Sequence, residues 1–191
     1  MKRFFITLLI ASISITIFAQ PRAAGVRIGA TGADLSYQHS LSWDKFIEGE
    51  AGIDFGATPT SGAGFKAAAT LNLIWARPAW TDRGSWALYS GPGLALGFVA
   101  DKVTHKTGNV KVSTNDNGFM LALAAQAGIE YTFWFPLQLS LDIRPYFGMH
   151  CSNGYEITGP DGTSASYGGK TGFYERGLLG FIPTLSARFR F

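Results

Sequence analysis

Long runs of strict alternation between apolar and polar residues restrict this 191-residue chain to a few folds. From Leu137 to Met149 (LQLSLDIRPYFGM), every odd-numbered residue is apolar, and polar or charged residues occupy most even-numbered positions. Because successive side chains of a strand point to opposite faces, this period predicts a strand with one apolar and one polar face. Globular strands usually contain about five or six residues, whereas a tilted strand needs roughly nine to eleven to cross a bilayer. The run from Leu137 to Met149 therefore has the length of a strand that crosses a bilayer.

The same pattern recurs along the chain and predicts eight antiparallel strands. Their ranges are 24–30, 33–40, 46–57, 64–76, 85–99, 118–133, 137–149 and 180–191. The apolar phase reverses near Gly32, so the first stretch must contain two strands joined by a tight hairpin at Thr31-Gly32, with Gly32 at positive φ. A phase reversal inside a single strand would instead require a bulge.

The amino-terminal stretch MKRFFITLLIASISITIFAQ has the pattern of a secretory signal peptide, with Lys2 and Arg3 before an apolar run and Ala19 near its end. We therefore expect a leader over 1–19 and a barrel over 20–191. Removing Lys2 and Arg3 lowers the formal charge from +3 to about +1, which argues against nucleic acid as a partner. Cys151 is the sole cysteine, so no intramolecular disulfide can form.

The composition is typical of strands that expose aromatic residues to lipid. The chain contains 24 Gly, 15 Phe and 7 Tyr, and a secreted β-sandwich that buries these aromatics is the alternative fold. The five tryptophans all fall in or beside connections predicted to lie at one end of the barrel: Trp43, Trp75, Trp80, Trp86 and Trp134. Aromatic residues gather where hydrocarbon meets lipid headgroups, so this distribution favours a membrane barrel over a sandwich.

These strands, with the segments GIEY (128–131), LDIRP (141–145) and the terminal ARFRF (187–191), resemble the small outer-membrane β-barrels of the OmpX/Ail and OmpA transmembrane-domain type. The resemblance implies an all-β, eight-stranded antiparallel up-and-down transmembrane β-barrel in the outer membrane of a Gram-negative bacterium. It further implies contact with outer-membrane lipids and lipopolysaccharide, recognition of Phe191 by the barrel assembly machinery, and a monomeric state. In such barrels the long connections, here 100–117 and 150–177, are extracellular and the short turns periplasmic.

Charged residues fall on the polar faces of the predicted strands and would point into the barrel. The expected interior charge network comprises Arg27, Glu48, Glu50, Asp54, Lys66, Glu130, Asp142, Arg144, Arg188 and Arg190, together with Asp34. Because an eight-stranded barrel is just wide enough for side chains to fill it, a nearly balanced set predicts an ion-paired plug and no diffusion pore. A path for protons or ions along these charges is the functional alternative.

One motif could carry chemistry, at the start of a long connection: His150-Cys-Ser-Asn-Gly154. It resembles the His-x-Ser-Asn signature of PagL-type lipid A deacylases, which implies Ser152 as nucleophile and His150 as general base. The acid-bearing segment of that family is missing here, so Glu156, Asp161 or the more distant Glu175 is left as the orienting acid. The parity of the strand from Leu137 argues against this, because even-numbered residues should point inward while that family's site faces lipid. We therefore expect no catalytic residues, with the lipid A acyl-ester hydrolase as the alternative.

Binding is expected in the exposed loops, which a rigid scaffold commonly uses for recognition. The connection 100–117 carries Lys102, His105, Lys106 and Lys111, which could contact lipopolysaccharide phosphates or glycans. The histidines lack ligand neighbours at metal spacing, so neither a metal nor another cofactor is expected. The sequence thus predicts a non-enzymatic barrel that acts through surface loops, in adhesion or ligand contact, or through envelope integrity.

Overall fold

The computed structural model describes residues 21–54, 64–99, 102–107, 110–158 and 163–191. The predicted leader over 1–19 lies outside these residues. The described part of the chain contains twelve strands and one 3-10 helix. The strands are β1 (Arg22–Gly29), β2 (Gly32–Ser40), β3 (Lys45–Asp54), β4 (Gly64–Ala76), β5 (Ser85–Val99), β6 (Lys102–Thr107), β7 (Val110–Thr132), β8 (Leu137–Ile143), β9 (Tyr146–Thr158), β10 (Ser164–Tyr167), β11 (Lys170–Phe173) and β12 (Thr184–Arg190), and the helix is η1 (Glu175–Phe181).

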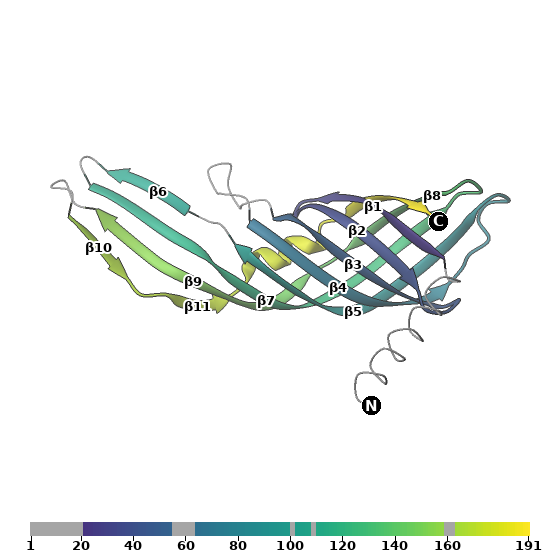
Figure 1. Cartoon of the computed structure of the whole chain (residues 1–191), viewed down its shortest axis with the longest axis horizontal. Helices are drawn as coiled ribbons and strands as arrows, with labels where there is room; N and C mark the ends of the chain where they lie inside the picture. Colours follow the sequence, from purple (N-terminus) through teal and green to yellow (C-terminus); the bar gives the residue numbers. More distant parts are fainter. Residues whose placement is uncertain (1–20, 55–63, 100–101, 108–109, 159–162) are drawn as a thin grey trace, which may run out of the picture.

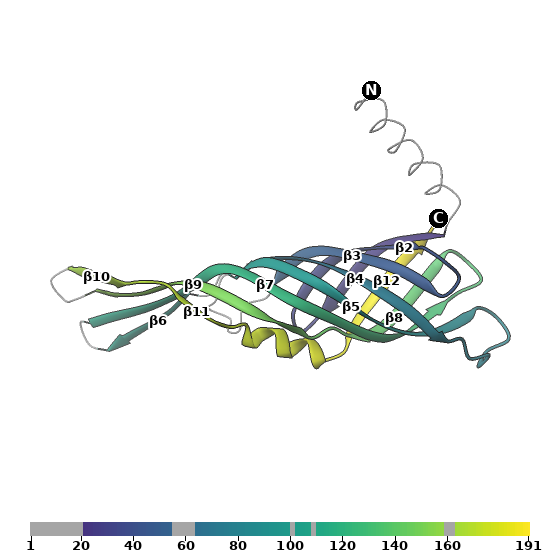
Figure 2. The same cartoon turned by 90° about the horizontal axis from the view of Figure 1, so that it is seen from below.

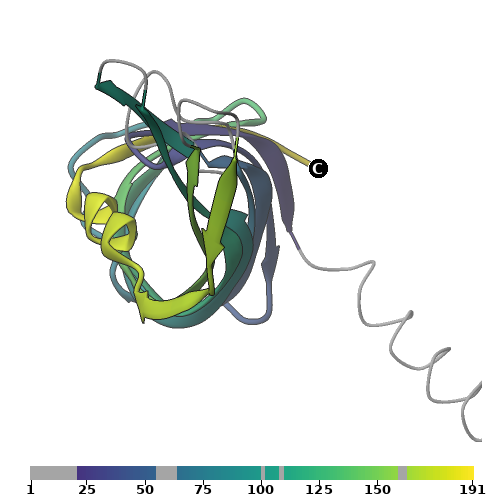
Figure 3. The same cartoon turned by 90° about the vertical axis from the view of Figure 1, so that its left-hand side faces the viewer.

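The strands form a closed, eight-stranded antiparallel β-barrel (Figures 1 and 3). The wall runs from β1 through β2, β3, β4 and β5 to β7, and each pair of neighbours is antiparallel. β8 and β9 lie end to end beside β7 and together occupy the next wall position. β12 pairs with β8 on one side and with β1 on the other, which closes the barrel. The predicted fold class is therefore confirmed.

The two ends of the barrel differ. At the turn end, which we define by the connections β2–β3, β4–β5 and β7–β8, the residues Pro21 and Phe191 also lie close together, and the backbones of Arg22 and Phe191 exchange hydrogen bonds. The opposite end, the loop end, carries a narrow sheet that extends beyond the barrel (Figures 1 and 2). This extension sheet consists of β6, residues 110–115 of β7, residues 154–158 of β9, and β10, paired in that order.

A bulge marks the boundary between the barrel and the extension sheet. The register of β7 against β9 shifts between Asn115 and Gly118, because Asn115 pairs with Gly154 while Gly118 pairs with Ser152. Such a bulge bends the strands and increases their twist. The connection predicted over 100–117 is thus largely a strand hairpin and no simple loop, although β5 and β7 stop pairing at Val99 and Gly118.

The predicted hairpin between the first two strands is present. Gly29 pairs with Gly32, so the two connecting residues are Ala30 and Thr31, one position earlier than predicted. Gly32 has φ of 146°, and a Cβ there would lie 1.9 Å from the carbonyl oxygen of Ile53. Glycine is therefore required at this position both by conformation and by the close approach of β3.

The wall strand predicted over 137–149 is interrupted at Arg144-Pro145. Pro145 has no N–H to donate to a ladder, and the Arg144 N–H donates to the carbonyl oxygen of Gly180 at 2.6 Å. η1 lies against β9 here, since a Cβ on Gly177 would lie 2.1 Å from the Tyr146 carbonyl oxygen. The strand predicted over 180–191 accordingly begins only at Thr184, because η1 occupies the wall position before it. The rest of the predicted connection 150–177 holds the end of β9, β10 and β11.

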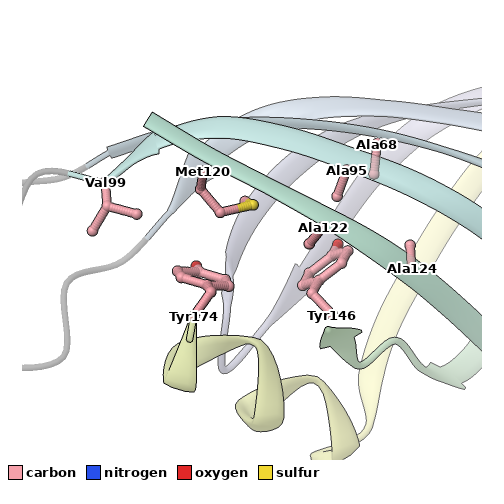
Figure 4. Packing of buried hydrophobic residues seen from close by; sticks show 8 residues of the cluster. All are labelled: Ala68, Ala95, Val99, Met120, Ala122, Ala124, Tyr146 and Tyr174. Atoms are coloured by element: carbon pink, nitrogen blue, oxygen red, sulfur yellow. The ribbon is translucent and has the colours of Figure 1, made fainter. Parts of the chain in front are cut away.

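Apolar side chains cover the outside of the barrel and polar ones fill most of its inside. On the outer wall, Leu35, Leu123 and Met149 are 70%, 64% and 62% exposed. Inside, near the loop end, one apolar cluster consists of Ala68, Ala95, Val99, Met120, Ala122, Ala124, Tyr146 and Tyr174 (Figure 4). Among the described residues, none of the helical structure is long and apolar enough to span a membrane.

Candidate functional site

The barrel interior is dominated by a chain of alternating charges. Two carboxylates at neighbouring inward positions of β3 are each shared by two guanidinium groups: Glu50 contacts Arg27 at 2.5 Å and also Arg144, and Glu48 contacts Arg144 at 3.1 Å and Arg188 at 2.5 Å. The arginines come from β1, from the break between β8 and β9, and from β12. This series of alternating charges therefore connects four separate parts of the wall across the interior.

Neutral side chains complete the hydrogen bonding of these carboxylates. Tyr146 donates its hydroxyl to Glu50 at 2.6 Å, and Gln126 donates its amide to Glu48 at 3.0 Å. Asp142 accepts a hydrogen bond from Tyr89 at 3.1 Å and forms an ion pair with Arg27. A buried ion pair offsets its desolvation only when additional hydrogen bonds of this kind satisfy the remaining lone pairs.

Two further ion pairs lie toward the loop end. Lys66 is 3.6 Å from Asp34 and donates hydrogen bonds to the backbone oxygen and hydroxyl of Thr31 at 2.9 and 3.0 Å. Asp54 lies 3.6 Å from Arg176 and accepts a hydrogen bond from the Tyr174 hydroxyl at 3.0 Å. Asp54 thereby connects the end of β3 to the segment around η1.

The predicted interior residues lie almost entirely inside the barrel. The buried members are Arg27, Glu48, Glu50, Asp54, Lys66, Glu130, Asp142, Arg144 and Arg188, and Asp34 is buried with them. Arg190, at the turn end, is half-buried. Glu130 is buried but accepts its hydrogen bond from a neutral group, the Gln38 amide, at 3.1 Å.

The interior network expected from the sequence included only charged residues, and it omitted the polar neutral residues and the contacts from η1. Gln38, Gln126 and Tyr146 occupy inward positions of predicted strands, so parity could have placed them inside. Tyr174 and Arg176 fall in a stretch interpreted as a loop, and no local pattern there indicates an approach to Asp54.

The motif His150-Cys-Ser-Asn lies on β9, and the parity of that strand is unbroken through it. From Tyr146 to Ser152 the described residues pair with β7 without a register shift, and Met149 and Cys151 are exposed on the outer wall. His150 is half-buried, and its ring lies 6.4 Å from that of the buried Tyr174, so it belongs to the inner face. Ser152 is half-buried as well, opposite Gly118.

Glu156 is poorly placed to orient His150. Both residues belong to the continuous strand β9, in which six residues span about 20 Å. A general base and its orienting acid must lie within hydrogen-bonding distance of one another. The backbone of β9 therefore disfavours the triad of Ser152, His150 and Glu156.

The four predicted loop residues lie on two adjacent strands of the extension sheet. Lys102, His105 and Lys106 belong to β6, and Lys111 belongs to β7, directly opposite Lys106. The fold thus brings together residues that the sequence places on a single connection. Among the described residues, no group of three or more histidine, cysteine, aspartate or glutamate side chains is arranged to hold a metal ion.

These features define the class of the protein, a closed eight-stranded antiparallel β-barrel with ion pairs inside and apolar side chains outside. Comparison with protein families, with curated proteins and with solved structures finds no match for this chain.

Proposed function

We propose that this chain is an integral outer-membrane β-barrel that conducts no solutes, catalyses no reaction and binds at the cell surface through its extension sheet. The observation that carries the membrane location is the inverted distribution of polarity. Buried Arg144, Arg188 and Glu48 lie inside, and exposed Leu, Phe and Met side chains cover the outside. Water cannot solvate such a surface favourably, whereas lipid can.

The tryptophans support the same location. Trp43, Trp75, Trp80 and Trp134 are 61% to 77% exposed, and all five tryptophans lie at the turn end. A continuous series of aromatic contacts joins Trp80 and Trp86 to the residues of the β7–β8 turn. Such a girdle favours the depth of the headgroups on the periplasmic side. The closed eight-stranded antiparallel barrel also agrees with the OmpX/Ail and OmpA type of barrel that the sequence resembles.

The extension sheet is the part best placed to act. The ion pairs that Arg144 and Arg188 form with Glu48 cross the interior and argue against a solute pore, and the inward parity of His150 and Ser152 argues against an acyl hydrolase in the membrane. The extension sheet projects beyond the barrel on a rigid base, as recognition elements commonly do. Lys102, Lys106 and Lys111 on its strands suit anionic groups such as lipopolysaccharide phosphates.

The membrane location is tested by fractionation and by gel mobility of the unheated protein. We expect recovery with the outer membrane and a faster band before heating, because a closed barrel stays compact in detergent. Recovery as soluble periplasmic protein would exclude the proposal.

The role of the extension sheet is tested by removing the half of it that carries the lysines, β6 and residues 110–115 of β7. Since Val99 pairs with Gly118, residues 100–117 can be replaced by a two-residue turn that keeps β5 and β7 in register. Cells with the full or the shortened chain are compared for binding of purified lipopolysaccharide and of a glycan array. We expect the shortened chain to assemble normally and to lose binding. If binding persists, the lysine-bearing half of the extension sheet is not the binding element. If only loss of the whole barrel has an effect, seen as sensitivity of the cells to detergents, the role is envelope integrity.

A further inference from the structure

A cavity of about 360 Å³ opens at the turn end, opposite the extension sheet. Its polar lining comes from parts of the chain that are distant in sequence, and the charged or amide residues are Arg22, Gln38, Arg77, Glu130, Gln138 and Arg190. Phe46 and Trp43 add apolar surface. This volume is at the lower end of the roughly 300–1,000 Å³ typical of ligand sites, enough for a molecule of amino-acid or dipeptide size.

Glu130 differs from the other buried carboxylates of the barrel. Asp34, Asp54, Asp142, Glu48 and Glu50 each have a lysine or arginine nitrogen within 4.0 Å. For Glu130 the described residues supply no such cation within that distance, although the residue is only 9% exposed. Among the described residues, Glu130 has only the more distant charge of Arg188, which already contacts Glu48 at 2.5 Å, so a positive group from a ligand would be stabilised beside it.

The neutral partners of Glu130 hold its carboxylate at the wall of the cavity. Gln138 donates to the side-chain oxygen of Gln38 at 2.8 Å, and Gln38 in turn donates to Glu130 at 3.1 Å. All three residues line the cavity. The amide relay fixes the carboxylate in position while leaving acceptor capacity for an ammonium group, because a carboxylate has about four lone-pair sites.

The positive charges lie nearer the solvent. Arg22 and Arg190 are half-buried, and Arg77 is exposed. Arg77 is held in place by a hydrogen bond from its guanidinium to the backbone oxygen of Trp43 at 2.6 Å. The cavity is therefore negative at its buried wall and positive at its mouth, and guanidinium groups are well suited to bind carboxylates.

We propose that this cavity binds a small zwitterion, an amino acid or the end of a short peptide, with its ammonium group on Glu130 and its carboxylate against Arg190 and Arg77. The separation of charge along the depth of the cavity selects for both groups at once. A molecule that carries only one of them leaves either the buried carboxylate or the guanidinium groups without a partner of opposite charge. This site is independent of the extension sheet and opens at the opposite end of the barrel.

Calorimetric titration of the purified full-length mature barrel in detergent tests this proposal. The probes are the dipeptide Ala-Ala, its N-acetyl derivative, its carboxyl amide and free alanine. We expect Ala-Ala to bind at least tenfold more tightly than either blocked form. Equal affinity of free alanine would identify an amino acid as the ligand, and binding of the dipeptide alone would identify a peptide end.

Variants separate the roles of the two charges. Glu130→Gln should weaken Ala-Ala binding at least tenfold and leave the affinity for the N-acetyl form unchanged. Arg190→Gln should also weaken Ala-Ala binding at least tenfold, but leave the affinity for the carboxyl amide unchanged. Arg83→Gln, an exposed charge at the same end that does not line the cavity, is the matched control. If no probe binds, or if the blocked dipeptides bind as well as Ala-Ala, the proposal is wrong. Comparison of the four probes on the wild-type protein tests the proposal even if Glu130→Gln does not fold.

Discussion

The guanidinium of Arg144 lies 3.1 Å from the carboxylate of Glu48, although Arg144 sits at the break between β8 and β9 and Glu48 lies on β3. The same guanidinium also contacts Glu50, so one arginine is shared by two consecutive inward carboxylates. All three side chains are at most 2% exposed. The pair thus joins opposite parts of the wall through a region that water does not reach.

Arg144→Ala should destabilise the barrel by about 3–5 kcal/mol, because it removes one of the two guanidinium groups that each of the buried carboxylates of Glu48 and Glu50 contacts. This change is measured by urea unfolding of the detergent-solubilised barrel, with gel mobility as the readout of the folded fraction. Arg83→Ala removes an exposed arginine and should alter the free energy of unfolding by no more than about 0.5 kcal/mol. Equal effects of the two substitutions would show that the Arg144 ion pairs do not stabilise the fold.

The barrel should form no channel of porin size in planar bilayers. Arg27, Arg144 and Arg188 cross the interior to Glu48 and Glu50, and an eight-stranded barrel has little volume beyond its own side chains. Stable, reproducible large conductance steps from purified protein would contradict a filled interior. A porin reconstituted in the same bilayer provides the positive control.

Ser152→Ala should leave the lipid A of the producing cells unchanged. Ser152 continues the inward parity of β9, and Glu156 lies about 20 Å along the strand from His150. Mass spectrometry of lipid A from cells with the wild-type chain, the variant and no chain makes the comparison. Loss of an acyl chain that depends on Ser152 would establish the hydrolase instead.

The first hairpin should be accessible from outside intact cells. Ala30 is exposed at its tip, so Ala30→Cys in a Cys151→Ser background should react with a membrane-impermeant maleimide. Asp82→Cys, at an exposed position of the turn end, should react only after the outer membrane is permeabilised. The reverse pattern would invert the proposed orientation.

The strands at the centre of the barrel were predictable because their side chains alternate between the polar interior and the apolar outer face. β4 and β5 begin and end at the predicted residues, since alternation is sustained and turn residues follow. The extension sheet was not predicted, because its strands are polar enough to resemble solvated loops and their pairing is seen only in the fold. η1 was also missed, because its place in the wall depends on Gly177 and Gly180 meeting β9.

Inward positions were likewise readable from parity, but the pairs were not. Which carboxylate meets which arginine depends on the stagger of distant strands, as for Arg27 with Asp142. The same stagger leaves Glu130 with no described cation within 4.0 Å and forms the cavity beside it. No sequence pattern distinguishes Glu130 from Glu48.

The closure of the barrel by β12 has a consequence for assembly. Ala23 pairs with Arg190, residues that are 190 − 23 = 167 positions apart, so this seam joins the two ends of the folded chain. Contacts between such distant residues are delayed by the entropy of loop closure. Until the seam forms, the sheet is open and Arg27 remains hydrated, without the hydroxyl of Thr184 on β12 that it contacts in the closed barrel. Dehydration of the interior charges therefore coincides with the final pairing event. The free-energy barriers to closing and to reopening the barrel both belong to this single cooperative step.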